Sequence, residues 1–215
     1  MKRFSFGLLI LLAACSSKGK KLPAVDLEKG RLLFESTCKT CHGAFGEGNP
    51  QLKSPALANL DGGYVYRQIM NFRRGVRGNV ASDTLGNQMA AFAKTLSDTI
   101  AIRNVIAYID SLPQIESTEK LAGDWKAGER TYQGLCGSCH GANGKGNPKL
   151  NAPQLNELAS WYLKNQFEKF RNGQRGLHPD DKFGAQMTSI VQVMTEGQSI
   201  DDVITYLRSE PPTSK

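Results

Sequence analysis

The sequence predicts an all-α protein made of two copies of one domain. Apolar residues recur at helical spacing, and no alternating strand pattern of useful length appears. The two halves of the chain also match at a constant offset of 98 residues. The match runs without insertion or deletion from Gly30 through Pro113 onto Gly128 through Pro211. A duplication of this length predicts two tandem domains of the same fold.

The N-terminal segment has the pattern of an export signal. Lys2 and Arg3 precede an apolar run over 4–12, which is too short to cross a bilayer because a spanning helix needs about 20 apolar residues. The run ends in Leu-Ala-Ala-Cys, which resembles the lipobox of bacterial lipoproteins. This resemblance implies cleavage before Cys15 and acyl chains on that residue, so we expect a periplasmic protein anchored to a membrane. The alternative is a plain signal peptide with a chance cysteine.

Each copy has three predicted helices separated by loops rich in glycine and proline. In the first copy they cover 26–37, 63–74 with Gly75 as C-cap, and a last helix that starts near Ser97 and stops before Pro113. The second copy repeats this order. We therefore divide the chain into a signal peptide with lipobox (1–15), a tether (16–25), a first domain (26–113), a polar linker (114–123) and a second domain (124–215).

The pentapeptide Cys-x-x-Cys-His occurs once in each copy. In this pattern two thiols add to the vinyl groups of haem c and the histidine binds the iron. Cys-x-x-Cys also serves thioredoxin-like redox sites and zinc sites, but two copies with the adjacent histidine favour haem. We predict two haem c groups, bound covalently by Cys38 and Cys41 and by Cys136 and Cys139, with His42 and His140 as axial ligands. Of the five cysteines only Cys15 remains, so no disulfide or catalytic thiol is expected.

A methionine follows each of these histidines at the same distance. Met89 lies 47 residues after His42, and Met187 lies 47 residues after His140. Met/His ligation closes the iron and favours the reduced state, which is typical of electron transfer. The alternatives are that the methionines are core residues and that His178 binds the second iron.

These motifs resemble those of class I cytochromes c, and over its mature length the chain is similar to the two-domain, dihaem cytochrome c-four family. The resemblance implies two cytochrome c folds that face each other across a shared interface. It also implies that the Pro55 and Pro153 carbonyls hold the axial histidines. Gly30 with Phe34, and Gly128 with Tyr132, resemble the family's crossing of first and last helices.

The motif Phe-Arg-x-Gly-x-Arg-Gly also occurs in both copies. Buried haem propionates need cationic or hydrogen-bonding partners. The candidates are Arg73, Arg77, Arg171 and Arg175, with an exposed patch for docking a partner as the alternative.

Charge and ligand pattern together favour an electron carrier over an enzyme. The formal net charge is +7, but no run of five to eight Lys or Arg residues appears, so we expect no nucleic-acid partner. We expect single electrons to pass from a quinol-oxidising complex or other donor to a terminal oxidase or reductase. The alternatives are a dihaem enzyme of the peroxidase or thiosulfate-oxidising type and a fixed subunit of a larger complex.

Overall fold

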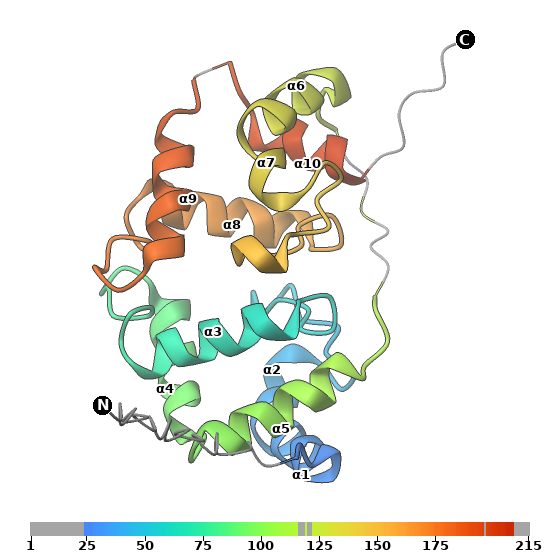
Figure 1. Cartoon of the computed structure of the whole chain (residues 1–215), viewed down its shortest axis with the longest axis vertical. Helices are drawn as coiled ribbons and strands as arrows, with labels where there is room; N and C mark the ends of the chain where they lie inside the picture. The colour runs from blue at the N-terminus through green and yellow to red at the C-terminus, as the bar shows by residue number, and fades with distance from the viewer. Residues whose placement is uncertain (1–23, 116–118, 120–121, 196, 209–215) are drawn as a thin grey trace, which may run out of the picture.

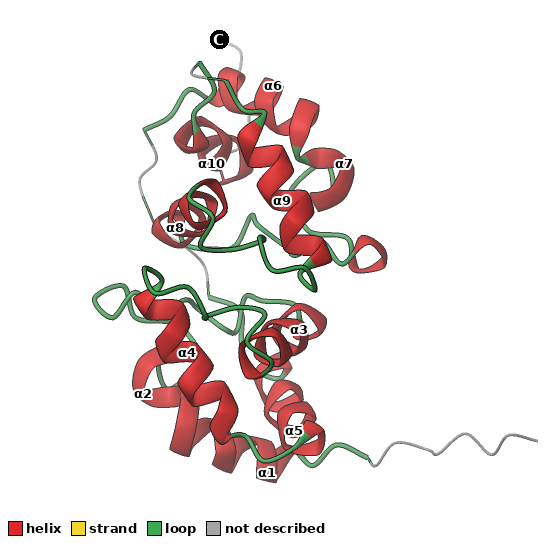
Figure 2. Cartoon of the chain, turned by 90° about the vertical axis from the view of Figure 1, so that its left-hand side faces the viewer, coloured by secondary structure: helices red, strands yellow, loops and turns green. Residues whose placement is uncertain are grey.

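The computed structural model describes residues 24–115, 119, 122–195 and 197–208. Within these residues the chain is helical and forms two domains, with the second above the first in Figure 1. Figure 2 shows helices and loops but no strand in the described part of the chain. The predicted signal peptide with Cys15, and most of the predicted tether, lie outside the described residues.

The two domains have the same order of main helices. The first contains α1 (Leu27–Leu33), the π-helical turn η1 (Phe34–Cys38), α2 (Lys39–His42), α3 (Gly62–Arg73), α4 (Thr84–Thr95) and α5 (Thr99–Asp110). The second contains α6 (Trp125–Leu135), α7 (Gly137–His140), the short 3-10 helix η2 (Pro148–Leu150), α8 (Ser160–Arg171), α9 (Lys182–Gln192) and α10 (Ile200–Arg208).

The helices α4 and α9 correct the sequence-based prediction, which placed a loop before the last helix of each domain. Both begin at an aspartate cap: the Asp83 side chain accepts a hydrogen bond from the Gly86 backbone, and Asp181 does the same for Gly184. The side chains that α4 buries are alanines, whereas the last helix, which the sequence did predict, buries isoleucine and valine. This correction matters because Met89 and Met187 lie on these two helices.

The first and last helices of each domain cross at a glycine, as the resemblance implies. A Cβ at Gly30 would collide with the carbonyl oxygen of Asn104 in α5. Next to this point the rings of Phe34 and Tyr108 lie 5.3 Å apart. The second domain repeats the crossing with Gly128, Asp202, Tyr132 and Tyr206. Close packing at this crossing holds α1 in place. Because η1 and α2 continue directly from α1, it also sets the position of the Cys-x-x-Cys-His pentapeptide in the domain.

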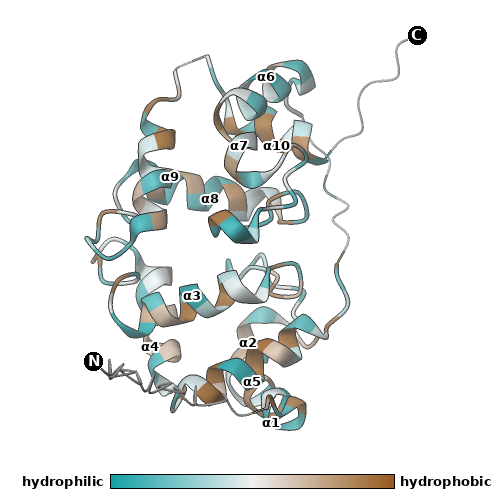
Figure 3. Ribbon diagram, in the orientation of Figure 1, coloured by the Kyte–Doolittle hydropathy of each residue, from teal (hydrophilic) through white to brown (hydrophobic). Residues whose placement is uncertain are grey.

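One apolar core continues from the first domain into the second. Figure 3 shows brown, apolar residues along α5, which buries Ile102, Val105, Ile106 and Ile109. The same cluster includes a set of residues on the facing sides of the two domains, namely Leu60, Tyr64, Leu158 and Tyr162. These four are two pairs related by the 98-residue offset, so equivalent surfaces of the two copies meet.

The side chain of Asn59 clamps the first domain to the start of the linker and to the second domain. Its amide nitrogen donates to the carbonyl oxygens of Ile115 at 2.7 Å and Glu157 at 2.8 Å. Its oxygen accepts from the backbone nitrogen of Ile115 at 2.8 Å. Since Asn59 is only 3% exposed, water cannot readily replace these partners.

We expect Asn59→Ala to lower the free energy of unfolding by about 1–3 kcal/mol, because it leaves partly buried backbone groups of Ile115 and Glu157 unpaired. Urea denaturation of the haem-loaded protein measures this loss. Asn143→Ala, at an exposed position, is the matched control. Equal midpoints for the two variants would show that the clamp contributes nothing to stability.

Candidate haem sites

Both pentapeptide histidines are buried and held by a proline carbonyl. His42 is 6% exposed, and its Nδ1 donates to the carbonyl oxygen of Pro55 at 2.8 Å. His140 is also 6% exposed and makes the same bond to Pro153 at 2.8 Å. A carbonyl oxygen can only accept, so the proton is on Nδ1 and Nε2 keeps its lone pair for a metal.

A glycine-rich loop brings each proline to its histidine. In the first domain the Gly48 nitrogen donates to the carbonyl oxygen of His42 at 2.7 Å, and Asn49 pairs with Ser54 in an isolated β-bridge. Gly48 has a φ of 84°, and a Cβ there would lie 2.6 Å from the Ala56 nitrogen. A side chain at this position would therefore move Pro55 away from the histidine.

Burial sets the protonation of these groups. It lowers the pKa of His42 and His140, and the bonds to Pro55 and Pro153 only partly offset this, so both rings are neutral at pH 7. Burial and the neighbouring cysteine raise the pKa of the free Cys38 thiol to about 12. A thioredoxin-like redox site needs the opposite shift, toward a thiolate.

The structure brings Met89 to the same pocket as the first pentapeptide. Cys38, Cys41, His42 and Met89 all line this pocket. Met89 is half-buried and packs against a small cluster made of Phe72, Ala90 and Ala93. The pocket thus has a histidine on α2 and a thioether on α4.

The second candidate methionine lies on the equivalent helix of the second domain. Met187 is half-buried on α9 and packs against Phe167, Phe170 and Val191. His178, the alternative ligand, lies in the loop before α9, where its Nδ1 accepts from the backbone nitrogen of Asp180 at 3.1 Å. One ring nitrogen of His178 is thus already engaged within its own loop.

The structure separates the four candidate arginines into two pairs. Arg77 and Arg175 are each 7% exposed and lie at the domain interface. Arg73 is half-buried and donates weakly to the Ser97 carbonyl at 3.5 Å, and the exposed Arg171 pairs with Glu168 at 3.1 Å. Only the first pair is therefore placed to meet a buried anion.

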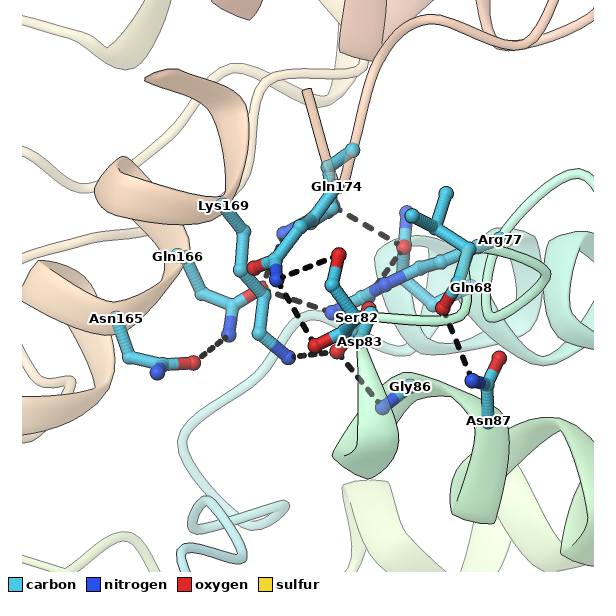
Figure 4. A network of polar contacts seen from close by, with 12 residues as sticks. Gln68, Arg77, Ser82, Asp83, Gly86, Asn87, Asn165, Gln166, Lys169 and Gln174 are labelled. Atoms are coloured by element: carbon cyan, nitrogen blue, oxygen red, sulfur yellow. Dashed lines mark hydrogen bonds and ion pairs between the residues drawn. The ribbon is translucent and has the colours of Figure 1, made fainter. Parts of the chain in front are cut away.

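Arg77 and Arg175 form a ring with two glutamines, part of which is drawn in Figure 4. Arg77 donates to Gln68 at 2.6 Å and to Gln166 at 2.8 Å. Arg175 donates to Gln166 at 2.6 Å and to Gln68 at 3.3 Å. Sequence reasoning did not select the glutamines, although the 98-residue offset pairs them and is the signal that identifies them.

This ring fits a cofactor with carboxylate groups. Both guanidinium groups are buried, yet they bond to neutral amides, and the Nε atoms of Arg77 and Arg175 are buried without a hydrogen-bond partner. Buried cations are costly without an anion. Because Arg77 also lines the first pocket, a haem propionate there would supply the missing charge and acceptors.

The second domain contributes to the wall of the first pocket. Tyr162, Gln166 and Lys169 on α8 line it together with His42 and Met89. Burial and the neighbouring Tyr64 raise the pKa of Tyr162 to about 12, so its hydroxyl is a neutral donor at this interface. The first site is therefore complete only when the two domains are docked.

No helix within the described ranges has the length and apolar character that a membrane span requires.

Comparison with known proteins gives a consistent assignment. The cytochrome c family profile matches residues 27–113 and 125–210. The chain is 31% identical over 186 residues to the cbb3-type cytochrome c oxidase subunit FixP of Azorhizobium caulinodans, covering 79% of this chain and 61% of that protein. Over several such oxidase subunits the chain spans about half of the relative's length.

Another relative is matched over most of its length. The "Thiosulfate dehydrogenase electron acceptor" of Stutzerimonas stutzeri is 30% identical over 183 residues, which cover 82% of this chain and 81% of that protein.

Solved structures share the two-domain fold. Cytochrome c4 of Acidithiobacillus ferrooxidans has a TM-score of 0.64 at 27% identity, with 80% of this chain and 98% of that chain covered. Reduced cytochrome c4 of Pseudomonas stutzeri has a TM-score of 0.63 at 23% identity, covering 86% and 98%. The chain belongs to the cytochrome c family and, with two such domains, is a dihaem electron-transfer protein of the cytochrome c4 type that carries two haem c groups.

Proposed function

We propose that each iron is closed on both faces by a histidine and a methionine, His42 with Met89 and His140 with Met187. The observation that carries this proposal is the first pocket. The buried His42, with a free Nε2, and the half-buried thioether of Met89 both line it. A soft, neutral thioether favours the ferrous state, so both sites should have fairly high potentials.

The remaining residues fix the cofactor in place. Cys38 and Cys41, and Cys136 and Cys139, hold the two haems as thioethers. Haem supplies a one-electron iron couple, and the chain supplies its position and its electrostatics. Arg77 and Arg175 bind the propionates at the interface between the two domains through charge-assisted hydrogen bonds.

The protein is a carrier and not an enzyme. Substrate chemistry at a haem needs an open coordination position, and paired His/Met ligation leaves none. The match over most of a thiosulfate dehydrogenase electron acceptor supports a mobile carrier of single electrons. The similarity to oxidase subunits supports a respiratory pathway, with a quinol-oxidising complex or other donor and a terminal oxidase or reductase as acceptor.

Export and anchoring complete the proposal. The N-terminal sequence ending in Leu-Ala-Ala-Cys15 supports a periplasmic lipoprotein. An acyl anchor would hold the carrier near membrane-bound partners and raise its effective concentration there.

Haem quantification with a potentiometric titration of the purified protein tests this function. We expect two haems per chain, two one-electron steps, and a ferric spectrum with the weak far-red band of methionine-bound iron. Rapid binding of cyanide by the wild-type protein, or turnover of peroxide or thiosulfate, would instead favour the dihaem enzyme.

A further inference from the structure

A buried ion pair joins the two domains beside the arginine and glutamine ring. Nζ of Lys169 in the second domain lies 2.5 Å from Oδ1 of Asp83 in the first. The Lys169 side chain is 8% exposed and that of Asp83 is 1% exposed. Figure 4 shows the ammonium group of Lys169 pointing at this carboxylate. A charge pair this buried is only weakly screened by solvent.

The pair breaks the symmetry of the duplicated interface. Under the 98-residue offset Asp83 corresponds to Asp181, so both copies have the carboxylate. Lys169 corresponds to Asn71, which is uncharged. The ring of Arg77, Arg175 and their glutamines has the same residue types in the two copies, so it adds one arginine charge from each copy and supplies no such difference. Among the described residues, an ammonium group pairs with Asp83 of the first domain but not with the equivalent Asp181 of the second.

The pair is also part of the first haem pocket. Lys169 lines that pocket together with His42 and Met89. Asp83 accepts a hydrogen bond from the Gly86 nitrogen at 3.0 Å and so caps α4, the helix that carries Met89. The other carboxylate oxygen of Asp83, Oδ2, is buried without a hydrogen-bond partner. The ammonium group of Lys169 is therefore the main group that offsets the buried negative charge of Asp83.

We propose that Lys169 is a tuning residue which makes the first haem easier to reduce relative to the second. One electron from a donor redox protein converts ferric to ferrous iron and lowers the charge of the site by one. A cation in the wall of a low-dielectric pocket stabilises that reduced state, whereas an uncompensated Asp83 would oppose it. This inference rests on the proposed two-haem carrier and adds a residue that shifts the potential of the first haem relative to the second.

Lys169→Met removes the ammonium group and keeps most of the apolar stem. We expect the reduction equilibrium constant of the first haem, relative to the second, to fall about tenfold, which equals about 59 mV for one electron. Lys164→Met is the matched control, because Lys164 is on the same helix but is 45% exposed and pairs with Asp201. The measurement is a potentiometric titration in which haem methyl resonances assign each step.

Three further variants separate charge from packing. Asp83→Asn should raise the reduction equilibrium constant of the first haem relative to the second. The double variant Lys169→Met with Asp83→Asn should have a ratio of these constants close to that of wild type. Asn71→Lys places an ammonium group opposite Asp181 and should raise the potential of the second haem. Asn71→Lys leaves Lys169 and Asp83 in place, so it keeps the test available if Lys169→Met folds poorly.

Two results would overturn the inference: equal shifts of both steps in Lys169→Met, or a shift no larger than that of Lys164→Met. Haem content and the methionine-to-iron band are recorded on the same samples. Fewer than two haems, or no such band in the wild type, would refute the proposed carrier itself. Two closed haems with an unchanged ratio would refute only the role of Lys169.

Discussion

Met89→Ala is expected to open the first iron to external ligands. With the thioether gone, the position facing α4 has no protein donor, so cyanide should bind one haem per chain. About half of the far-red methionine-to-iron absorption should disappear, because the second site is untouched. The potential of the first haem should fall by on the order of 0.1 V or more, since axial ligands set haem potentials over a wide range. Absorption spectroscopy and a potentiometric titration measure these effects.

Met187→Ala should remove the other half of that absorption, and the two substitutions together should remove all of it. Met70→Ala is the control, because Met70 is a partly buried residue of α3 that packs against the main core. It should lose stability without changing the spectrum. Retention of the full band in Met89→Ala would show that the first iron has another ligand.

Gly128→Ala should cause the largest loss of stability. The new Cβ would collide with the carbonyl oxygen of Asp202, and backbone in a packed helix cannot move aside easily. We expect a loss of about 3 kcal/mol in the free energy of unfolding, at the upper end for overpacking. Urea denaturation followed by circular dichroism measures it.

Gly134→Ala is the control for this substitution on the same helix. Apart from its chain neighbours and the backbone of its own helix, no atom lies within 4 Å of a Cβ at Gly134. Because alanine favours helix over glycine by about 0.5–1 kcal/mol, this variant should be as stable as wild type or slightly more so. If Gly128→Ala were equally well tolerated, α6 and α10 would not cross as closely as the structure shows.

The duplication explains why much of the fold was predictable. A residue that recurs at the same offset is retained in both copies, so the repeat separated Met89 and Met187 from the unmatched methionines. The helices α5 and α10, with isoleucine, valine and leucine at helical spacing, were equally clear. In contrast, α4 and α9 each have a glycine in the first turn, which lowers helix propensity, and the side chains that α4 buries are alanines. Their aspartate caps were the usable signal.

The interface was harder to predict from sequence. Gln68 and Gln166 are equivalent under the 98-residue offset. This equivalence does not indicate that the two residues accept hydrogen bonds from arginines across the domain interface. Lys169 gives no such signal, because its partner Asp83 lies 86 positions away and its counterpart Asn71 is of another type. Hydrogen bonds and ion pairs between domains depend on how two folded domains dock. The periodicity of apolar residues along the sequence contains no information about that docking.

The ring of arginines and glutamines bears on how the chain arose. Arg77 bonds to Gln68 of its own copy and Gln166 of the other, and Arg175 does the reverse. An exchange of this type is isologous, the form of contact that joins identical subunits in twofold homodimers. A single ancestral domain with this face would have been self-complementary before gene fusion. Covalent linkage then allowed one half to acquire a lysine that the other lacks, which no strictly symmetric homodimer can do.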